Sequence, residues 1–225
     1  MAANYDTIGK TYTSTRAADP RITRRLIDLL ALPENSSIID IGAGSGNYSH
    51  ALTDYGFDVM AVEPSETMRA QARVHKNLTW QDAVAEALPF ADDQFDGAVM
   101  TLSLHHFTDW RRGIEQALRV TATGPLVIFA FDIEPKSKFW LYDYFPEFAA
   151  IDQSWSATLS EIRLFIEQVL QYRFDCFPFP RPKDLIDHFA AAGWARPEIY
   201  LEERYRHLLA SEYYDPGYLF LRIQK

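Results

Sequence analysis

The sequence predicts an α/β domain built on a mostly parallel sheet with helices on both faces. Short apolar runs alternate with amphipathic helical segments from residue 36 to 132, which is the pattern of βαβ units. Most of these apolar runs are continuous, as expected of strands buried on both faces. The chain has 225 residues, of which 48% are hydrophobic, enough for one domain with a sizeable core.

The first elements follow from their periodicity and their end signals. Residues 20–31 place apolar side chains on one face of a helix. Asp19 is placed to cap this helix, and Pro20 suits its first turn. Residues 36–42 then predict a buried strand, and residues 47–56 predict a helix that ends at a glycine.

The same alternation continues to residue 132. Ser65 and Asp109 are placed to cap two further helices, and Gly124 is placed to end the second of them. The predicted elements are, in order, strand 57–65, helix 65–76, strand 78–83, strand 95–106, helix 109–124 and strand 125–132.

After residue 132 the pattern changes. Residues 133–180 are rich in aromatic side chains and end in a proline-rich stretch, and we interpret them as a helical lid inserted over one edge of the sheet to cover a substrate. The rest of the sheet is expected from helix 183–194, strand 196–204 and strand 217–224.

We treat residues 1–225 as one domain, in which residues 1–31 form N-terminal cap helices. A net charge of −9 and the lack of any Lys/Arg run longer than two argue against nucleic-acid binding. No apolar stretch approaches the length that spans a bilayer, and the polar start is unlike a secretion signal. We therefore expect a cytoplasmic protein with no membrane partner. With Cys176 as its one cysteine, the sequence can form neither a disulfide within the chain nor a cysteine metal cluster, and we expect no metal.

Three glycines follow the first predicted strand, at Gly42, Gly44 and Gly46. In open parallel sheets ligands bind outside the carboxyl ends of the strands, and glycine lets a ligand approach the backbone closely. The dinucleotide fingerprint Gly-x-Gly-x-x-Gly would need a glycine where this chain has Asn47. The loop therefore favours a ligand without phosphates.

Acidic residues end the first three predicted strands. Asp40 can orient the glycine loop and hold an ammonium group, and Glu63 can accept hydrogen bonds from both hydroxyls of a ribose. Glu63 alone does not separate this site from an NAD site. Asp82 and the backbone N–H of Ala83 are placed to meet the edge of an adenine.

The stretches IIDIGAGSGNYSHAL, VMAVEPSETM, DAVAEALPFADDQFDGAVM and HHF resemble class I S-adenosylmethionine-dependent methyltransferases of the methyltransferase type 11 group, over about residues 4 to 132. The resemblance implies a Rossmann-like three-layer sandwich with a seven-stranded sheet in the order 3-2-1-4-5-7-6, its last strand antiparallel. It implies S-adenosyl-L-methionine as cofactor and S-adenosyl-L-homocysteine as product. The activity would be in-line SN2 transfer of a methyl group to an oxygen, nitrogen or carbon of a small organic molecule.

The resemblance also implies a set of cofactor-binding residues. Met68 would pack on the adenine, Thr101 or Leu102 would offer a carbonyl to the ammonium, and Arg16 would pair with the carboxylate. The full set is Tyr5, Arg16, Asp40, Gly42, Ala43, Gly44, Gly46, Glu63, Pro64, Met68, Asp82, Ala83, Thr101 and Leu102.

His105 and His106 are the clustered histidines of the chain and follow the fourth predicted strand. Either could act as a base with a near-neutral pKa, or could merely cap the next helix or fill the wall. By analogy with phosphoethanolamine methyltransferases, His106 and Tyr12 are the candidate catalytic residues. The candidate substrate-lining residues are His105, Trp140, Tyr144 and Trp155.

Two other functions share some of these features. An NAD-dependent oxidoreductase would share the sheet and Glu63, but no Tyr-x-x-x-Lys pair follows the fourth strand. A non-catalytic cofactor-binding subunit is the second alternative. The Asn/Asp-Pro-Pro-Tyr sequence of DNA amino-methylases is absent after that strand, so we expect a small-molecule acceptor and a monomer or homodimer.

Overall fold

The computed structural model describes residues 16–131, 157–180, 182, 184–187 and 218–225. The predictions for Tyr5, Tyr12, Trp140, Tyr144 and Trp155 lie outside these residues.

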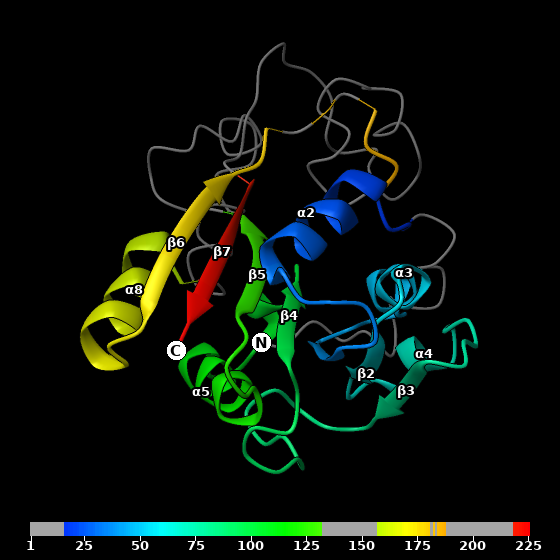
Figure 1. Cartoon of the computed structure of the whole chain (residues 1–225), viewed down its shortest axis with the longest axis horizontal. Helices are drawn as coiled ribbons and strands as arrows, with labels where there is room; N and C mark the ends of the chain where they lie inside the picture. The colour runs from blue at the N-terminus through cyan, green and yellow to red at the C-terminus, as the bar shows by residue number, and fades with distance from the viewer. Residues whose placement is uncertain (1–15, 132–156, 181, 183, 188–217) are drawn as a thin grey trace.

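The described residues form a seven-stranded sheet in the order β3-β2-β1-β4-β5-β7-β6 (Figure 1). The first five strands pair in parallel, and β7 is antiparallel to both of its neighbours. This confirms the predicted order. The strands are β1 (Ser37–Ile41), β2 (Asp58–Val62), β3 (Leu78–Gln81), β4 (Gly97–Thr101), β5 (Leu126–Phe131), β6 (Arg173–Pro178) and β7 (Tyr218–Gln224).

Helices cover both faces of this sheet, as expected for parallel strands joined by crossovers. They are α2 (Pro20–Leu30), α3 (Asn47–Tyr55), α4 (Glu66–Arg69), the 3₁₀ turn η2 (Leu104–His106), α5 (Trp110–Val120), α8 (Leu159–Leu164) and the π-helical turn η3 (Phe165–Val169) that continues α8.

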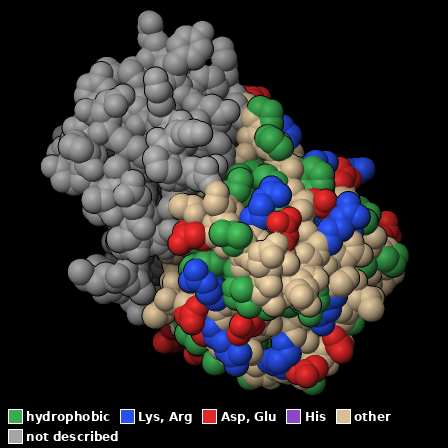
Figure 2. Space-filling view, turned by 90° about the vertical axis from the view of Figure 1, so that its left-hand side faces the viewer, with side chains coloured by type: hydrophobic (Ala, Val, Ile, Leu, Met, Phe, Trp, Pro, Cys, Tyr) green, Lys and Arg blue, Asp and Glu red, His purple; other side chains and the backbone are tan. Residues whose placement is uncertain are grey.

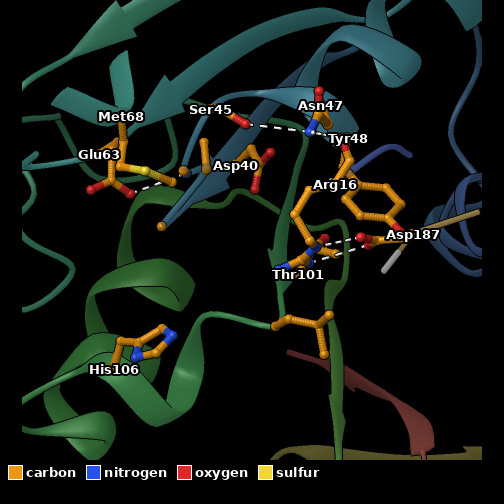
Figure 3. A pocket seen from close by; sticks show the side chains of 14 residues that line it. Arg16, Asp40, Ser45, Asn47, Tyr48, Glu63, Met68, Thr101, His106 and Asp187 are labelled. Atoms are coloured by element: carbon orange, nitrogen blue, oxygen red, sulfur yellow. Dashed lines mark hydrogen bonds and ion pairs between the residues drawn. The ribbon is translucent and has the colours of Figure 1, made fainter. Parts of the chain in front are cut away.

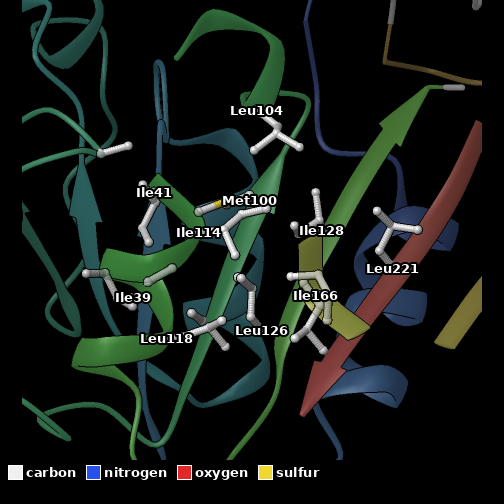
Figure 4. Packing of buried hydrophobic residues seen from close by; sticks show 14 of the residues in the cluster. Ile39, Ile41, Met100, Leu104, Ile114, Leu118, Leu126, Ile128, Ile166 and Leu221 are labelled. Carbon is white, nitrogen blue, oxygen red and sulfur yellow. The ribbon is translucent and has the colours of Figure 1, made fainter. Parts of the chain in front are cut away.

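Successive residues of each central strand enter two different cores. Ile38, Val99, Val127 and Phe220 pack with α2 and α3. Their chain neighbours, among them Ile39, Met100, Ile128 and Leu221, pack with α5 and α8 (Figure 4). The sheet is therefore the middle layer of the predicted three-layer sandwich.

The predicted helix caps are confirmed. The Asp19 carboxylate accepts a 2.9 Å hydrogen bond from the Arg21 backbone N–H. The Ser65 hydroxyl accepts one from Met68 N at 3.3 Å. Each bond satisfies an N–H that a helix start leaves without an internal partner.

Two predicted helix ends are wrong. The helix expected over 65–76 ends at Arg69. Val74, farther along that range, is 98% exposed, and a short helix without an apolar face to bury is marginal in water. Helix α5 ends at Val120, before Gly124. Gly124 instead lets two backbone segments pass close to each other, because a Cβ there would lie 1.8 Å from the Asp96 carbonyl oxygen.

The sixth strand also differs from the prediction. It is Arg173–Pro178, taken from the range assigned to the lid, and it pairs along β7 with Phe174 opposite Ile223. Residues 159–169 form α8 and η3, which pack on the sheet. The lid range 133–180 is therefore too long, since residues 159–178 belong to the sandwich. The strand expected over 196–204 lies outside the described residues.

Figure 2 shows one face of the described region, where basic and acidic side chains are interspersed without forming a continuous basic stripe. Within the described parts of the chain, every helix is too short or too polar to cross a bilayer.

Candidate cofactor site

A cavity lies at the carboxyl ends of β1, β2 and β4, with an empty volume of about 570 Å³ including the part open to solvent (Figure 3). This is the edge where ligands of open parallel sheets bind. The cavity is lined by Arg16, Asp40, Gly42, Ala43, Gly44, Ser45, Asn47, Tyr48, Glu63, Met68, Thr101, Leu102, His106 and Asp187.

The glycine loop adopts a conformation that side chains would hinder. Gly42, Gly44 and Gly46 all have positive φ, at 75°, 59° and 78°. A Cβ on Gly42 would lie 2.5 Å from the Ser103 Cβ, and one on Gly46 would lie 2.6 Å from the Trp80 ring. The glycines therefore permit both the turn and its close packing on neighbouring strand ends.

Glu63 ties the end of β2 to this loop. One carboxylate oxygen accepts a 3.0 Å hydrogen bond from Gly44 N, and the other accepts a 3.0 Å bond from Ser65 N. These bonds fix the orientation of the carboxylate at the cavity wall. A carboxylate has about four acceptor positions, so such bonds are compatible with further bonds from hydroxyl groups.

Asp40 is a deeply buried acid of the site, with 1% of its surface exposed. Its Oδ2 accepts a 2.6 Å hydrogen bond from the Ser49 hydroxyl, whereas Oδ1 has no partner among the described residues. Burial, together with the nearby Glu63 charge, raises the pKa of Asp40 to about 6. A cation next to Oδ1 would relieve this burial penalty.

The end of β4 offers a second unpaired polar atom. The Thr101 hydroxyl is buried and has no partner among the described residues. Leu102 follows with φ of 54°, a conformation that non-glycine residues rarely adopt and that is frequent at ligand sites. A 2.8 Å hydrogen bond from Leu102 N to the Phe129 carbonyl holds it.

Arg16 reaches the cavity but is already engaged with a carboxylate. Its Nε and Nη2 donate to Asp187, the second bond at 3.2 Å, and Tyr48 donates a 2.8 Å bond to the same carboxylate. Asn47 Nδ2 donates a 3.1 Å bond to the Arg16 carbonyl oxygen. Figure 3 shows Asp187 between Arg16 and Tyr48 at the side of the cavity.

The two histidines differ in position. His106 lines the cavity, whereas His105 does not. The centroid of the His105 ring lies 3.8 Å from that of His106 and 5.1 Å from that of Phe131. Burial, aided by the positive charge of Arg16, lowers the pKa of His106 to about 4, and burial lowers that of His105 well below its usual value. The expectation of a near-neutral pKa is therefore wrong.

Several predicted residues stand outside the cavity wall. His105, Pro64, Asp82, Ala83 and Gly46 do not line the cavity. Asp82 is largely exposed and accepts a 3.0 Å hydrogen bond from Arg69 Nη2 at the end of β3. Its predicted contact with adenine stays a prediction.

Sequence reasoning missed four residues of the wall. Ser45, Tyr48 and Asn47 belong to the glycine loop and the first turn of α3, so their place in the motif was a usable signal. Asp187 lies 171 residues after Arg16, and no local pattern links the two.

Comparison with known proteins places this fold and cavity in one class. The family described as "Methyltransferase domain" matches residues 39–129. A solved protein of Anabaena variabilis, described as a candidate methyltransferase from an antibiotic biosynthesis pathway, is 34% identical with a TM-score of 0.84. That match covers 94% of this chain and 99% of the other.

Two further relatives match more distantly. The demethylmenaquinone methyltransferase of Paenarthrobacter aurescens is 27% identical over 62% of this chain and 55% of its own length. The solved YcgJ protein of Bacillus subtilis is 18% identical with a TM-score of 0.63 over 91% of this chain and 98% of its own, and shows the fold alone. The match to this chain spans roughly half the length of the curated relatives.

Fold and site together define a class I S-adenosylmethionine-dependent methyltransferase domain. On the strength of the relative that it matches at 34% identity over nearly the whole of both chains, this chain belongs to that family.

Proposed function

We propose that this protein transfers a methyl group from S-adenosylmethionine to a small organic acceptor. The observation that carries the proposal is the pairing of two acids at one cavity. Glu63 presents a carboxylate that backbone N–H groups hold in place, and Asp40 presents a buried oxygen with no partner among the described residues. A nucleoside with a cationic amino-acid tail would satisfy both.

The residues fit this cofactor in three places. Glu63 would hold the ribose hydroxyls, and Met68, which is 2% exposed, would pack against the adenine. Asp40 and Thr101, each with an oxygen that has no partner among the described residues, would hold the ammonium end. The glycine loop would pass close to the tail because no Cβ intervenes.

The site disfavours the alternative of NAD. A pyrophosphate at the glycine loop would meet the carboxyl group of Asp40, which is buried and has no cation within hydrogen-bonding distance among the described residues. Bringing anions together in such a site is unfavourable. Asn47 also occupies the position of the third glycine of a dinucleotide loop.

When bound, S-adenosylmethionine supplies a methyl group that its positively charged sulfur already activates. The protein's contribution is then to bind, to align and to exclude water. Alignment of two reactants accounts for roughly 7–11 kcal/mol of barrier reduction in well-oriented reactions. The buried strand ends and the glycine loop, which a hydrogen bond from Gly44 N ties to Glu63, would provide the frame for such alignment.

His106 would form an uncharged part of the cavity wall that faces the methyl acceptor. A base whose pKa is about 4 removes protons poorly at neutral pH. We therefore propose that the neutral ring of His106 contacts the acceptor and does not act as a base. The pairing of His106 with Tyr12 as catalytic residues remains a prediction, because Tyr12 lies outside the described residues.

The acceptor is proposed to be a small molecule rather than a macromolecule. The Paenarthrobacter aurescens relative is named as a demethylmenaquinone methyltransferase, and the Anabaena variabilis protein is described as part of an antibiotic biosynthesis pathway. The aromatic residues of the predicted lid, Trp140, Tyr144 and Trp155, would suit a flat or apolar acceptor.

A two-stage experiment tests this proposal. Isothermal titration with S-adenosylhomocysteine and with NAD comes first, and we expect binding of the former only. The purified protein is then incubated with S-adenosylmethionine and a pool of phenols, amines and quinols, and S-adenosylhomocysteine formation is followed. Binding of NAD alone would support the oxidoreductase, and cofactor binding without turnover of any acceptor would support a non-catalytic subunit.

A further inference from the structure

Asp187 is a buried carboxylate at the cavity for which the proposed reaction has no direct use. It is 1% exposed. One oxygen accepts from Arg16 Nε, and the other accepts from Arg16 Nη2 and from the Tyr48 hydroxyl. This two-bond fork determines the plane in which the Arg16 guanidinium lies.

The three residues of this cluster come from separate parts of the chain. Arg16 precedes α2, Tyr48 lies in the first turn of α3, and Asp187 belongs to the short described segment 184–187. Their side chains nevertheless meet at one side of the cavity (Figure 3).

The backbone on both sides of the Arg16–Asp187 pair is anchored by neighbouring contacts. The Ile186 N–H donates a 3.1 Å bond to the buried Asp19 carboxylate. Farther out, Arg21 and Asp184 form a 2.7 Å ion pair at the surface. The segment therefore has an inner tie through Asp187 and an outer tie through Asp184.

The charge of Arg16 acts on the cavity although the residue is paired. It contributes to the lowered pKa values of His105 and His106. Tyr48 remains a protonated donor, because burial and the neighbouring Asp187 raise its pKa. A guanidinium carries five N–H donors in a rigid fork, so one arginine can serve two carboxylates.

We propose that Asp187, held by Tyr48, is a positioning residue that fixes the Arg16 guanidinium where it recognises the carboxylate of the cofactor's amino-acid tail. This inference rests on the proposed function. If Asp187 served only to hold segment 184–187 in place, its side chain would not need to lie in the cavity wall, as it does.

The test compares two ligands by isothermal titration. S-adenosylhomocysteine carries the tail carboxylate, and its decarboxylated analogue keeps the ammonium but lacks the carboxylate. The ratio of the two affinities measures carboxylate recognition alone. Arg16→Gln should lower that ratio about tenfold or more, as expected for loss of a charge-assisted hydrogen bond.

Asp187→Asn should lower the same ratio by about threefold to tenfold, because the side chain keeps an acceptor but loses the fork and the charge. Asp184→Asn is the matched control. It breaks the outer tie of the same segment, and as an exposed pair it should leave the ratio within about twofold. Tyr48→Phe, which removes only the hydroxyl bond to Asp187, serves as a second variant if Asp187→Asn fails to fold.

The outcomes distinguish failure of the positioning role from failure of the proposed function. The positioning role would be overturned if Asp187→Asn or Tyr48→Phe lowered the affinity for both ligands equally. It would also be overturned if Asp184→Asn and Asp187→Asn changed the ratio equally. Either result would leave the proposed function intact. If the wild-type protein binds neither ligand, the proposed function fails and this inference fails with it.

Discussion

Glu63 and Gly44 are joined by a 3.0 Å hydrogen bond from the glycine N–H to the carboxylate, although 19 positions separate them. The bond connects the end of β2 to the loop after β1. The same carboxylate can therefore shape the loop and face a ligand in the cavity.

Replacing Glu63 by Gln should weaken binding of S-adenosylhomocysteine by about 10-fold to 100-fold, because hydrogen bonds to a charged group contribute about 1.5–3 kcal/mol. Titration calorimetry measures this effect. Glu66→Gln, at an exposed position four residues from the end of β2, is the control and should bind normally. Unchanged affinity in Glu63→Gln would mean that the ribose is held elsewhere.

Asp40 should make the stability of the ligand-free protein depend on pH. Its pKa is about 6 in the folded protein against 3.8 for an ordinary aspartate. The folded state therefore binds more protons between these two values, and the free energy of unfolding decreases as pH rises through that window.

Asp40→Asn removes this titration. Relative to wild type, its free energy of unfolding should rise by about 1–3 kcal/mol between pH 4 and pH 7.5, while its affinity for S-adenosylhomocysteine falls. Urea denaturation at both pH values measures the difference, with Asp58→Asn at an exposed strand start as the control. If the difference in unfolding free energy between Asp40→Asn and wild type did not change with pH, this would contradict the burial of an Asp40 oxygen that has no partner among the described residues.

The two histidines should stay neutral well below pH 6.5. NMR titration of the His106 ring should give a midpoint near pH 4. In the unfolded chain histidine takes up a proton at about pH 6.5, so this burial costs stability as pH falls below that value. A midpoint near 6.5 would restore His106 as a candidate base.

Replacing His106 by Ala should slow turnover and leave the affinity for S-adenosylhomocysteine within about twofold, since the proposed function places the ring at the acceptor and only uncharged contacts are lost. The assay uses an acceptor found in the pool screen. His75→Ala, at a position outside the cavity wall, is the control. An unaltered rate in His106→Ala would leave this residue a purely structural role.

Gly46 should tolerate no side chain. Gly46→Ala should lower the free energy of unfolding by more than about 2 kcal/mol, since a positive φ is unfavourable for alanine and the new Cβ meets the Trp80 ring. Gly44→Ala has a similar φ but meets only the flexible end of Met68 at 3.3 Å, so it should cost about 1 kcal/mol. Equal losses in thermal or urea unfolding would contradict the role assigned to Trp80.

The parts of this fold that sequence predicted are those fixed by local chemistry. Asp19 and Ser65 cap helices because a side-chain oxygen meets an N–H within the same turn. Gly42 and Gly44 mark a turn that must have positive φ. These signals need only a few adjacent residues, and they located the cavity correctly.

The parts that sequence did not predict depend on tertiary contacts. Arg173–Pro178 looked like part of a lid because of its aromatics and prolines, yet β7 pairs with it, and Pro178 is tolerated because β6 lies at the sheet edge. Asp187 joins Arg16 only after the chain has folded. The pKa of His106 reflects burial, which no local pattern reports.

A crystal structure of the protein grown with S-adenosylhomocysteine tests the central claim most directly. We predict the nucleoside in the cavity at the ends of β1, β2 and β4, its ribose hydroxyls on Glu63 and its ammonium beside Asp40. Density for the ligand at another place, or a cavity that stays empty at saturating ligand, would contradict the assignment of this site.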